Sequence, residues 1–213
     1  MSKIMFVGDL HLSIQSPISR KEDNKQWMDL QIAKLKHIYD YAEQIKAEAI
    51  IYAGDIFNSS SINMVSGQFL IDVIDQFKRV TSYSIIGNHD MYFRNEELFG
   101  YTILNLMFKT GTLKHLDKIY TDDVLIQGTD YLKDIPMVDN DLITKPDYAI
   151  SVSHQLYENS QWATEENSNL TDLEASQKGY NAYFLGHDHN NYEPAQIGKY
   201  LLLRPRSNSE RNI

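Results

Sequence analysis

Short apolar runs alternate with amphipathic segments along the first half of the chain. Three runs have the length and content of buried strands: residues 3–7, 49–53 and 82–86. Apolar residues recur at helical spacing in three other segments, which are predicted to be helices: 27–46, 65–78 and 96–108. The predicted buried face of the first helix consists of Leu30, Ala33, Leu35, Ile38, Ala42 and Ile45. This order of strands and helices is typical of a parallel sheet covered by helices.

From residue 113 onward, short strands separated by polar turns replace this pattern. The predicted strands are 116–120, 124–128, 131–132, 148–153, 180–185 and 200–203. Segments 13–25 and 156–168 are predicted to be surface loops, the second of them mobile, and a short helix is expected over 170–177. The run of strands predicts a second sheet. We find no internal repeat or linker, so one domain over 1–213 is expected.

Polar side chains follow the predicted strands at the point where each strand ends. These residues are Asp9, His11, Asp55, Asn88, His89, Asp90, His154, His187 and His189. A glycine precedes four of the groups: Gly8, Gly54, Gly87 and Gly186. Because the carboxyl ends of parallel strands meet at one edge of a sheet, we expect a shared site there.

Five of the seven histidines belong to this set, whereas His37 on a predicted helix and His115 in a predicted turn are expected to be ordinary core or turn residues. The chain has no cysteine, so any metal must be bound by nitrogen and oxygen. Imidazole and carboxylate suit Zn, Mn and Fe, and a carboxylate can bridge two ions. Two ions roughly 3.5 to 4 Å apart stabilise the attacking and leaving oxygens of a displacement at phosphorus. The set therefore predicts phosphoester hydrolysis.

The ordered motifs Asp9-Leu10-His11, Gly54-Asp55, Gly87-Asn88-His89-Asp90, His154 and Gly186-His187-Asp188-His189 resemble those of the calcineurin-like metallophosphoesterases. The resemblance implies a four-layer α/β/β/α sandwich, with two central mixed sheets flanked by helices. It implies two divalent ions, with Mn²⁺ expected first and Zn²⁺, Fe²⁺ or Mg²⁺ as alternatives. Carried over by position, Asp9, His11, Asp55 and His189 would hold one ion. Asp55, Asn88, His154 and His187 would hold the other, with Asp55 as the bridge.

The same resemblance implies the roles of the remaining residues. A metal-bridging hydroxide would be the nucleophile. His89 would protonate the leaving oxygen, and Asp90 would be the partner that orients His89.

Within that superfamily, the first two motifs and the loop between them are similar to those of recombination and repair nucleases that partner a chromosome-maintenance (SMC-like) ATPase. This resemblance implies a DNA substrate and an ATPase partner. The substrate-capping domain of those nucleases is not expected here, because only residues 190–213 follow the last motif. Either the chain is a minimal nuclease core, such as a phage-encoded one, or the sequence lacks a downstream part. Arg20 and Lys21 could lie in a solvated loop or contact phosphate groups, and the sequence favours neither. Arg204, Arg206 and Arg211 are expected in a frayed tail.

The formal net charge of −9 argues against a general basic surface for nucleic acid, although bound cations could make the site locally positive.

Three functions stay open: a DNA exonuclease or endonuclease first, then a phosphatase or phosphodiesterase for a phosphoprotein or small molecule such as a cyclic nucleotide, and last a non-catalytic binding protein. The aromatic residues near the motifs could stack on a base of the substrate, or they could be there only because tyrosine is frequent in this chain. These residues are Tyr92, Phe93, Tyr157 and Trp162. Without a signal-peptide core or a membrane-length apolar run, a cytoplasmic location is expected, and a homodimer is left open.

Overall fold

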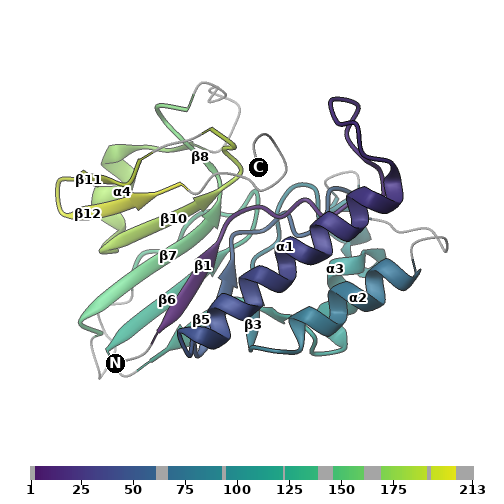
Figure 1. Cartoon of the computed structure of the whole chain (residues 1–213). Helices are drawn as coiled ribbons and strands as arrows, with labels where there is room; N and C mark the ends of the chain where they lie inside the picture. The colour runs from purple at the N-terminus through teal and green to yellow at the C-terminus, as the bar shows by residue number, and fades with distance from the viewer. Residues whose placement is uncertain are drawn as a thin grey trace.

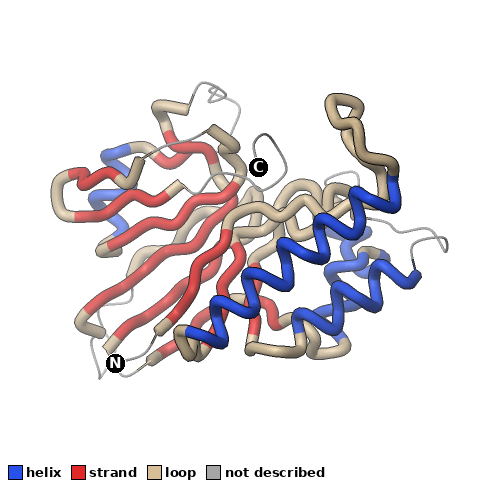
Figure 2. Tube along the Cα trace, in the orientation of Figure 1, coloured by secondary structure: helices blue, strands red, loops and turns tan. Residues whose placement is uncertain are grey.

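The computed structural model describes residues 3–60, 67–92, 95–121, 123–138, 146–160, 169–190 and 193–204. Two sheets pack face to face, and helices cover their outer surfaces (Figure 1). The alternation of strands and helices along the trace is clear in Figure 2. This arrangement confirms the predicted α/β class, with two sheets flanked by helices.

The first sheet is parallel in every described pairing and has the order β1-β2-β3-β4. Its strands are β1 (Ile4–Val7), β2 (Ala49–Tyr52), β3 (Ser82–Ser84) and β4 (Lys114–His115). The last residues of the four strands are in register, because Val7 pairs with Tyr52, Tyr52 with Ser84, and Ser84 with His115. The segments that follow these strands therefore leave the sheet at one edge.

The second sheet is mixed and has the order β11-β12-β10-β7-β6-β5. Its strands are β5 (Lys118–Tyr120), β6 (Val124–Thr129), β7 (Tyr148–His154), β10 (Ala182–Gly186), β11 (Ala195–Ile197) and β12 (Tyr200–Leu203). The four inner strands are parallel and the two outer pairings are antiparallel. Gly186 pairs with His154, so these two strands also end at the same edge.

Three apolar clusters hold the layers together. Between the sheets lies a cluster that includes Ile51, Ile85, Ile126 and Val152. The helices α1 (Asn24–Gln44), α2 (Gly67–Phe77) and α3 (Ile103–Lys109) cover the first sheet, and α4 (Asp172–Lys178) covers the second (Figure 1). Within the described residues, none of the helices is both long enough and apolar enough to cross a bilayer.

The predicted buried face of the first helix is partly wrong. The residues that α1 buries are Trp27, Gln31, Leu35, Tyr39 and Ala42, whereas Leu30 is 39% exposed and Ala33 is also exposed. The Gln31 amide contacts both backbone groups of Ser13, and the Tyr39 hydroxyl lies 2.8 Å from Ser82 Oγ. Gln31 and Tyr39, whose side chains have polar ends, thus lie on the buried face of α1, which the spacing of apolar residues did not predict.

Several predicted boundaries are also corrected. The segment 96–108 is not one helix, because a 3-10 helix over Glu96–Tyr101 ends before Thr102, which caps the start of α3. Tyr131 and Leu132 form a turn rather than a strand, with a left-handed φ of 65° at Leu132. Leu156 and Tyr157 are not in a surface loop, since they form β8 (Leu156–Tyr157), are buried, and pair with β9 (Asn169–Leu170). Residues 65–66 and 161–168 lie outside the described part.

Candidate metal centre

Backbone hydrogen bonds join the turn after β1 to the turn after β2. The amides of Leu10 and His11 both donate to the carbonyl oxygen of Asp55, at 3.1 and 2.9 Å. The amide of Leu12 donates to the Ile56 carbonyl oxygen at 2.9 Å. These bonds fix the backbones of the first two motifs against each other.

Three of the predicted site residues have left-handed backbone conformations that glycine would adopt more easily. The φ angles are 49° at His11, 48° at Asp55 and 84° at His187. A non-glycine residue in this region costs on the order of 1–3 kcal/mol and persists only where its surroundings enforce it. Hydrogen bonds from their backbone amides hold two of these residues in place: the His11 amide donates to the Asp55 carbonyl oxygen, and the His187 amide donates to Oδ2 of Asp9.

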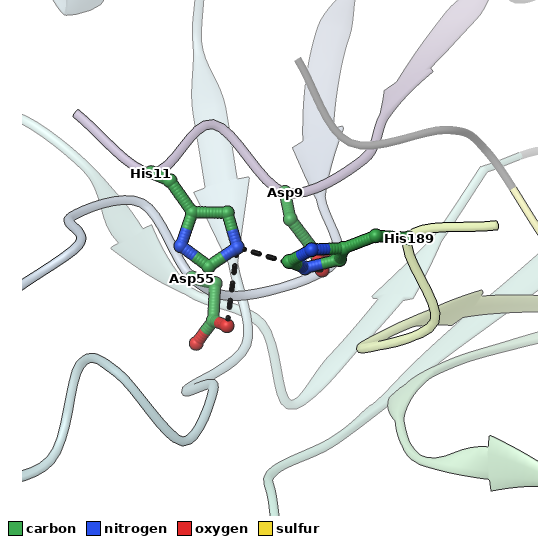
Figure 3. A group of neighbouring side chains, drawn as sticks. All are labelled: Asp9, His11, Asp55 and His189. Carbon is green, nitrogen blue, oxygen red and sulfur yellow. Dashed lines mark hydrogen bonds and ion pairs between the residues drawn. The ribbon is translucent and has the colours of Figure 1, made fainter. Parts of the chain in front are cut away.

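The first group of side chains converges around one point (Figure 3). Potential ligand atoms of Asp9, His11, Asp55 and His189 all lie within 4.8 Å of one another. Nε2 of His11 is 2.9 Å from Nε2 of His189 and 3.6 Å from Oδ2 of Asp55. Nε2 of His189 is 3.3 Å from Oδ2 of Asp9.

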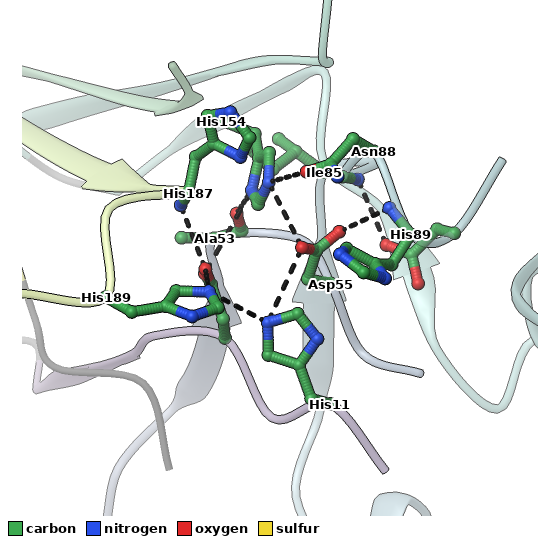
Figure 4. Close-up of polar contacts among 12 residues, drawn as sticks. His11, Ala53, Asp55, Ile85, Asn88, His89, His154, His187 and His189 are labelled. Atoms are coloured by element: carbon green, nitrogen blue, oxygen red, sulfur yellow. Dashed lines mark hydrogen bonds and ion pairs between the residues drawn. The ribbon is translucent and has the colours of Figure 1, made fainter. Parts of the chain in front are cut away.

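The second group lies on the other side of Asp55 (Figure 4). Nε2 of His154 is 2.8 Å from Oδ1 of Asn88 and 3.4 Å from Oδ2 of Asp55. His187 belongs to this side through its ring, whose centroid is 4.9 Å from that of His154. Its backbone amide donates to Oδ2 of Asp9 at 2.9 Å, which connects the two groups. The structure thus brings all seven predicted metal ligands together.

The donor set fits cations rather than a self-contained hydrogen-bond network. Nδ1 of His154 lies 2.7 Å from the Ala53 carbonyl oxygen, so Nδ1 carries a proton and Nε2 is the ring nitrogen that faces the site. Nε2 faces the oxygen atoms of Asn88 and Asp55, which are acceptors, so a neutral imidazole is mismatched with them. In the metal-free protein a second proton on Nε2 resolves this, and a bound metal ion would take the place of that proton. Oδ2 of Asp55 and Nδ1 of His11 are buried and form no hydrogen bond within the described residues. A positive charge among these atoms removes the mismatch.

The pKa shifts describe a buried site that combines an ionised carboxylate, one protonated imidazole and two neutral imidazoles. Burial lowers the pKa of His154, but the carboxylates of Asp55 and Asp9 outweigh it and raise this pKa to about 10. Burial raises the pKa of Asp55, and the nearby His154 and His11 more than reverse this, so the carboxyl stays ionised. Burial lowers the pKa of His11 and of His187 to about 4, so both are neutral and able to bind metal near pH 7.

The predicted relation between His89 and Asp90 is wrong. Asp90 is fully buried, and its carboxylate accepts hydrogen bonds from the backbone amides of Gly87 at 3.0 Å and Phe57 at 3.3 Å. Burial, and then the charge of Asp55, raise the pKa of Asp90 to about 8. Asp90 therefore holds the turn, whereas His89 is exposed and its Nδ1 lies 3.1 Å from the carbonyl oxygen of Asn58.

Two glycines allow the ligands to pack this closely. A Cβ on Gly87 would overlap the carboxylate and amide nitrogen of Asp55. A Cβ on Gly186 would overlap the Ala53 carbonyl oxygen and the Asp9 carboxylate. Glycine is needed here because backbone and ligand approach closely.

Several features of the site carry no clear signal in the sequence. Tyr131, which the pattern assigned to a strand, places its ring 6.0 Å from that of His154 and 5.6 Å from that of His187. The Asn58 contact uses a backbone carbonyl, which any residue would supply.

The predictions for the aromatic residues and arginines are partly corrected. Tyr157 is only 1% exposed, so it cannot stack on a base. Arg204 is not part of a frayed tail, because it is 7% exposed and donates to Oδ1 of Asn159 at 2.7 Å. The Arg20 guanidinium lies 5.1 Å from the ring centroid of Trp27. Phe93, Trp162, Arg206 and Arg211 lie outside the described residues.

Comparisons with known proteins agree with this geometry. A family model described as calcineurin-like phosphoesterase matches residues 2–191. A dimetal phosphatase from Danio rerio is similar over 99% of this chain and 89% of its own, with a TM-score of 0.63 and 11% identity. The protein TT1561 of Thermus thermophilus is similar over 97% of this chain and 90% of its own, with a TM-score of 0.55 and 10% identity.

A 5'-nucleotidase from Candida albicans is similar over 97% of this chain and 46% of its own, with a TM-score of 0.53 and 16% identity. At such identities these structures share the fold alone. No protein with a curated function matches the sequence.

Proposed function

Because this chain belongs to the calcineurin-like phosphoesterase family, we propose that it hydrolyses phosphate esters at a centre of two divalent metal ions. One arrangement carries the proposal. Oδ2 of Asp55 lies 3.6 Å from Nε2 of His11 and 3.4 Å from Nε2 of His154. His11 follows β1 of the first sheet and His154 ends β7 of the second, and the two imidazoles approach the same carboxylate oxygen, as expected for a ligand shared by two ions.

In this proposal each ion has four protein ligands. Asp9, His11, Asp55 and His189 hold one ion, and Asp55, Asn88, His154 and His187 hold the other. When bound, the ions supply Lewis-acid stabilisation of the attacking and leaving oxygens at phosphorus. Mn²⁺ is the first candidate, and Zn²⁺, Fe²⁺ and Mg²⁺ are the alternatives.

His89 is proposed as the proton donor to the leaving oxygen. It is exposed beside the ligands, with its ring centroid 4.9 Å from that of His11, so a bound ester can reach it. The Asn58 carbonyl oxygen accepts a hydrogen bond from Nδ1 and orients the ring. Nε2 is then the atom that donates the proton. Asp90 supports this step by holding the turn that carries His89.

We propose DNA as the first substrate to test, since the motifs around Asp9 and Asp55 resemble those of repair nucleases. A small phosphoester is the second candidate, favoured by the net charge of −9, which weakens attraction to a polyanion. A partner ATPase of the chromosome-maintenance type is a further proposal that follows from the first candidate. A homodimer is a separate proposal that does not depend on the substrate.

The deciding experiment compares hydrolysis of single-stranded DNA, double-stranded DNA, bis-p-nitrophenyl phosphate and p-nitrophenyl phosphate, each with Mn²⁺ and with EDTA. Asp55→Asn, purified in parallel, controls for contaminating nucleases. DNA cleavage that requires both Mn²⁺ and Asp55 supports the nuclease. Cleavage of the aryl esters alone rejects DNA and retains the phosphoesterase. No hydrolysis of any ester with Mn²⁺, Zn²⁺, Fe²⁺ or Mg²⁺ rejects the proposed function.

A further inference from the structure

The ring of Tyr131 lies against two predicted ligands of the second ion. Its centroid is 5.6 Å from the His187 ring and 6.0 Å from the His154 ring, and those two rings are 4.9 Å apart. Tyr131 contacts His154 nearly edge-on, with an interplanar angle of 78°, and it is partly buried against the core under the first sheet. The three rings form a packed set, so removing one leaves the other two with space to rotate.

The backbone that carries Tyr131 is anchored to the first sheet. The Tyr131 amide donates to the carbonyl oxygen of Ile86 at 2.9 Å, and the Ile86 amide donates to Oδ1 of Asp130 at 2.8 Å. Nε2 of His115, at the end of β4, lies 2.9 and 3.0 Å from the two carboxylate oxygens of Asp130. Asp130 and Tyr131 follow β6 of the second sheet, so these contacts join the two sheets.

The segment of Asp130 and Tyr131 is connected to the ligands of the second ion in two ways. Ile86 is two residues before Asn88, whose Oδ1 lies 2.8 Å from Nε2 of His154. On the other side, the Tyr131 ring contacts His154 and His187 directly. By contrast, no ring contact or hydrogen bond links the Tyr131 side chain to Asp9, His11 or His189 among the described residues.

We propose that Tyr131 is a positioning residue for the second metal site: its ring, anchored through Asp130 to Ile86 and His115, holds the imidazoles of His154 and His187 in the orientation that binds the ion. This inference rests on the proposed function, because it assumes that these imidazoles are ligands. It adds a residue that selectively supports one of the two sites. Since the Tyr131 hydroxyl forms no hydrogen bond within the described residues, the planar ring is the part that acts.

The test is a Mn²⁺ titration of EDTA-treated protein by isothermal calorimetry, with electron paramagnetic resonance to distinguish isolated from paired Mn²⁺ ions. Wild type should bind two ions that couple magnetically. Tyr131→Ala should retain the first ion and weaken the second by about 10- to 100-fold, the usual effect of losing an outer partner of a ligand. Tyr131→Phe should match wild type, and Tyr101→Ala, at an 83% exposed tyrosine, is the control for loss of an aromatic residue.

The outcomes separate this inference from the proposed function. Failure of wild type to bind two ions rejects the proposed centre itself. Two ions bound by Tyr131→Ala with wild-type affinity, or equal weakening of both ions, overturns the role of Tyr131 and leaves the centre intact. If Tyr131→Phe weakens binding of the second ion as much as Tyr131→Ala does, the role of the ring is also overturned, because the hydroxyl would then be the acting group. If Tyr131→Ala does not fold, Tyr131→Leu keeps apolar volume without the planar ring, and the same comparison decides.

Discussion

Nε2 of His154 lies 3.4 Å from Oδ2 of Asp55, although His154 ends β7 of the second sheet and Asp55 follows β2 of the first. The opposite Nδ1 is bonded to the Ala53 carbonyl oxygen at 2.7 Å, which fixes the tautomer and directs Nε2 toward the carboxylate. Ala53 is two residues before Asp55, so one short segment both orients the imidazole and supplies the oxygen that it faces. The position of Asp55 between the two groups of ligands is therefore built into the packing of the sheets.

Asp55→Asn should abolish binding of both ions rather than one. The neutral amide lacks the charge that a bridging ligand shares between two cations, and one of its two positions becomes a donor. A Mn²⁺ titration should show no binding at concentrations that saturate wild type, and ester hydrolysis should fall to background. Asp29→Asn, on an exposed position of α1, is the matched control. Retention of one tightly bound ion by Asp55→Asn would contradict the bridging role.

His89→Ala should leave Mn²⁺ binding intact and slow hydrolysis. Loss of a general acid typically costs about 10²- to 10⁴-fold in turnover. The loss should depend on the ester, because p-nitrophenolate leaves without a proton whereas a sugar alkoxide does not. We therefore expect a large decrease in kcat for an alkyl phosphodiester and a small one for bis-p-nitrophenyl phosphate. Equal decreases for both esters would contradict proton donation by His89.

The position of the site was predictable from the sequence because parallel topology converts sequence order into spatial proximity. Asp9, Asp55 and Asn88 follow neighbouring strands, and strand registers that end together bring them to one edge. The partner of His89 was not predictable in this way. Adjacency of Asp90 suggested a contact, but the buried Asp90 carboxylate binds two backbone amides, and a carbonyl from another turn reaches His89 instead.

Gly87→Ala should damage both the fold and the metal centre. Its Cβ would overlap the carboxylate and amide nitrogen of Asp55, so one of the two segments must move. Such overpacking typically costs about 1–3 kcal/mol in the free energy of unfolding, and displacement of Asp55 should also weaken Mn²⁺ binding. Gly100→Ala is the control, because no atom lies within 4 Å of a Cβ at that position. Thermal melts and Mn²⁺ titrations of the two variants check this, and wild-type behaviour of Gly87→Ala would reject the close approach.

The fold class followed from the alternation of strand and helix patterns, but individual helix faces did not. In α1 the apolar spacing selected Leu30, whereas the structure buries Gln31. A buried amide is tolerated here because Ser13 supplies both a donor and an acceptor, and periodicity cannot detect such a partner 18 residues away. Periodicity also failed to detect the break before α3. The apolar spacing over 96–108 predicted one helix, but Thr102 caps the start of α3 within this segment.

Gln31→Met should destabilise the protein although it places a more apolar residue at a buried position. The Gln31 amide accepts from the Ser13 amide at 2.8 Å and donates to the Ser13 carbonyl oxygen at 2.7 Å. Loss of both bonds should lower the free energy of unfolding by about 2 kcal/mol, because partly buried backbone groups lose their partners. Gln44→Met, at the exposed end of the same helix, controls for the change in composition. Urea denaturation of both variants measures the difference, and equal stability would show that water replaces the amide.

The ion pair between His115 and Asp130 should give the protein a pH-dependent contribution to stability. The hydrogen bond that the His115 ring donates to the Asp130 carboxylate raises the pKa of His115 above 6.5, against the opposing effect of burial. Because the folded state binds this proton more tightly than the unfolded chain, the stabilisation is complete below pH 6.5 and is lost as pH rises through the folded pKa. The His115 side chain is 42% exposed, so solvent screening keeps the contribution below about 1 kcal/mol.

Two measurements on EDTA-treated protein check this prediction. An NMR titration should place the His115 midpoint above pH 6.5. The difference in unfolding free energy between wild type and His115→Gln should be largest at acidic pH and decrease as pH rises. His37→Gln, on an exposed position of α1, is the control for removing a histidine that has no carboxylate partner among the described residues. A midpoint at or below 6.5 would mean that Asp130 stabilises Ile86 and Tyr131 without holding a protonated His115.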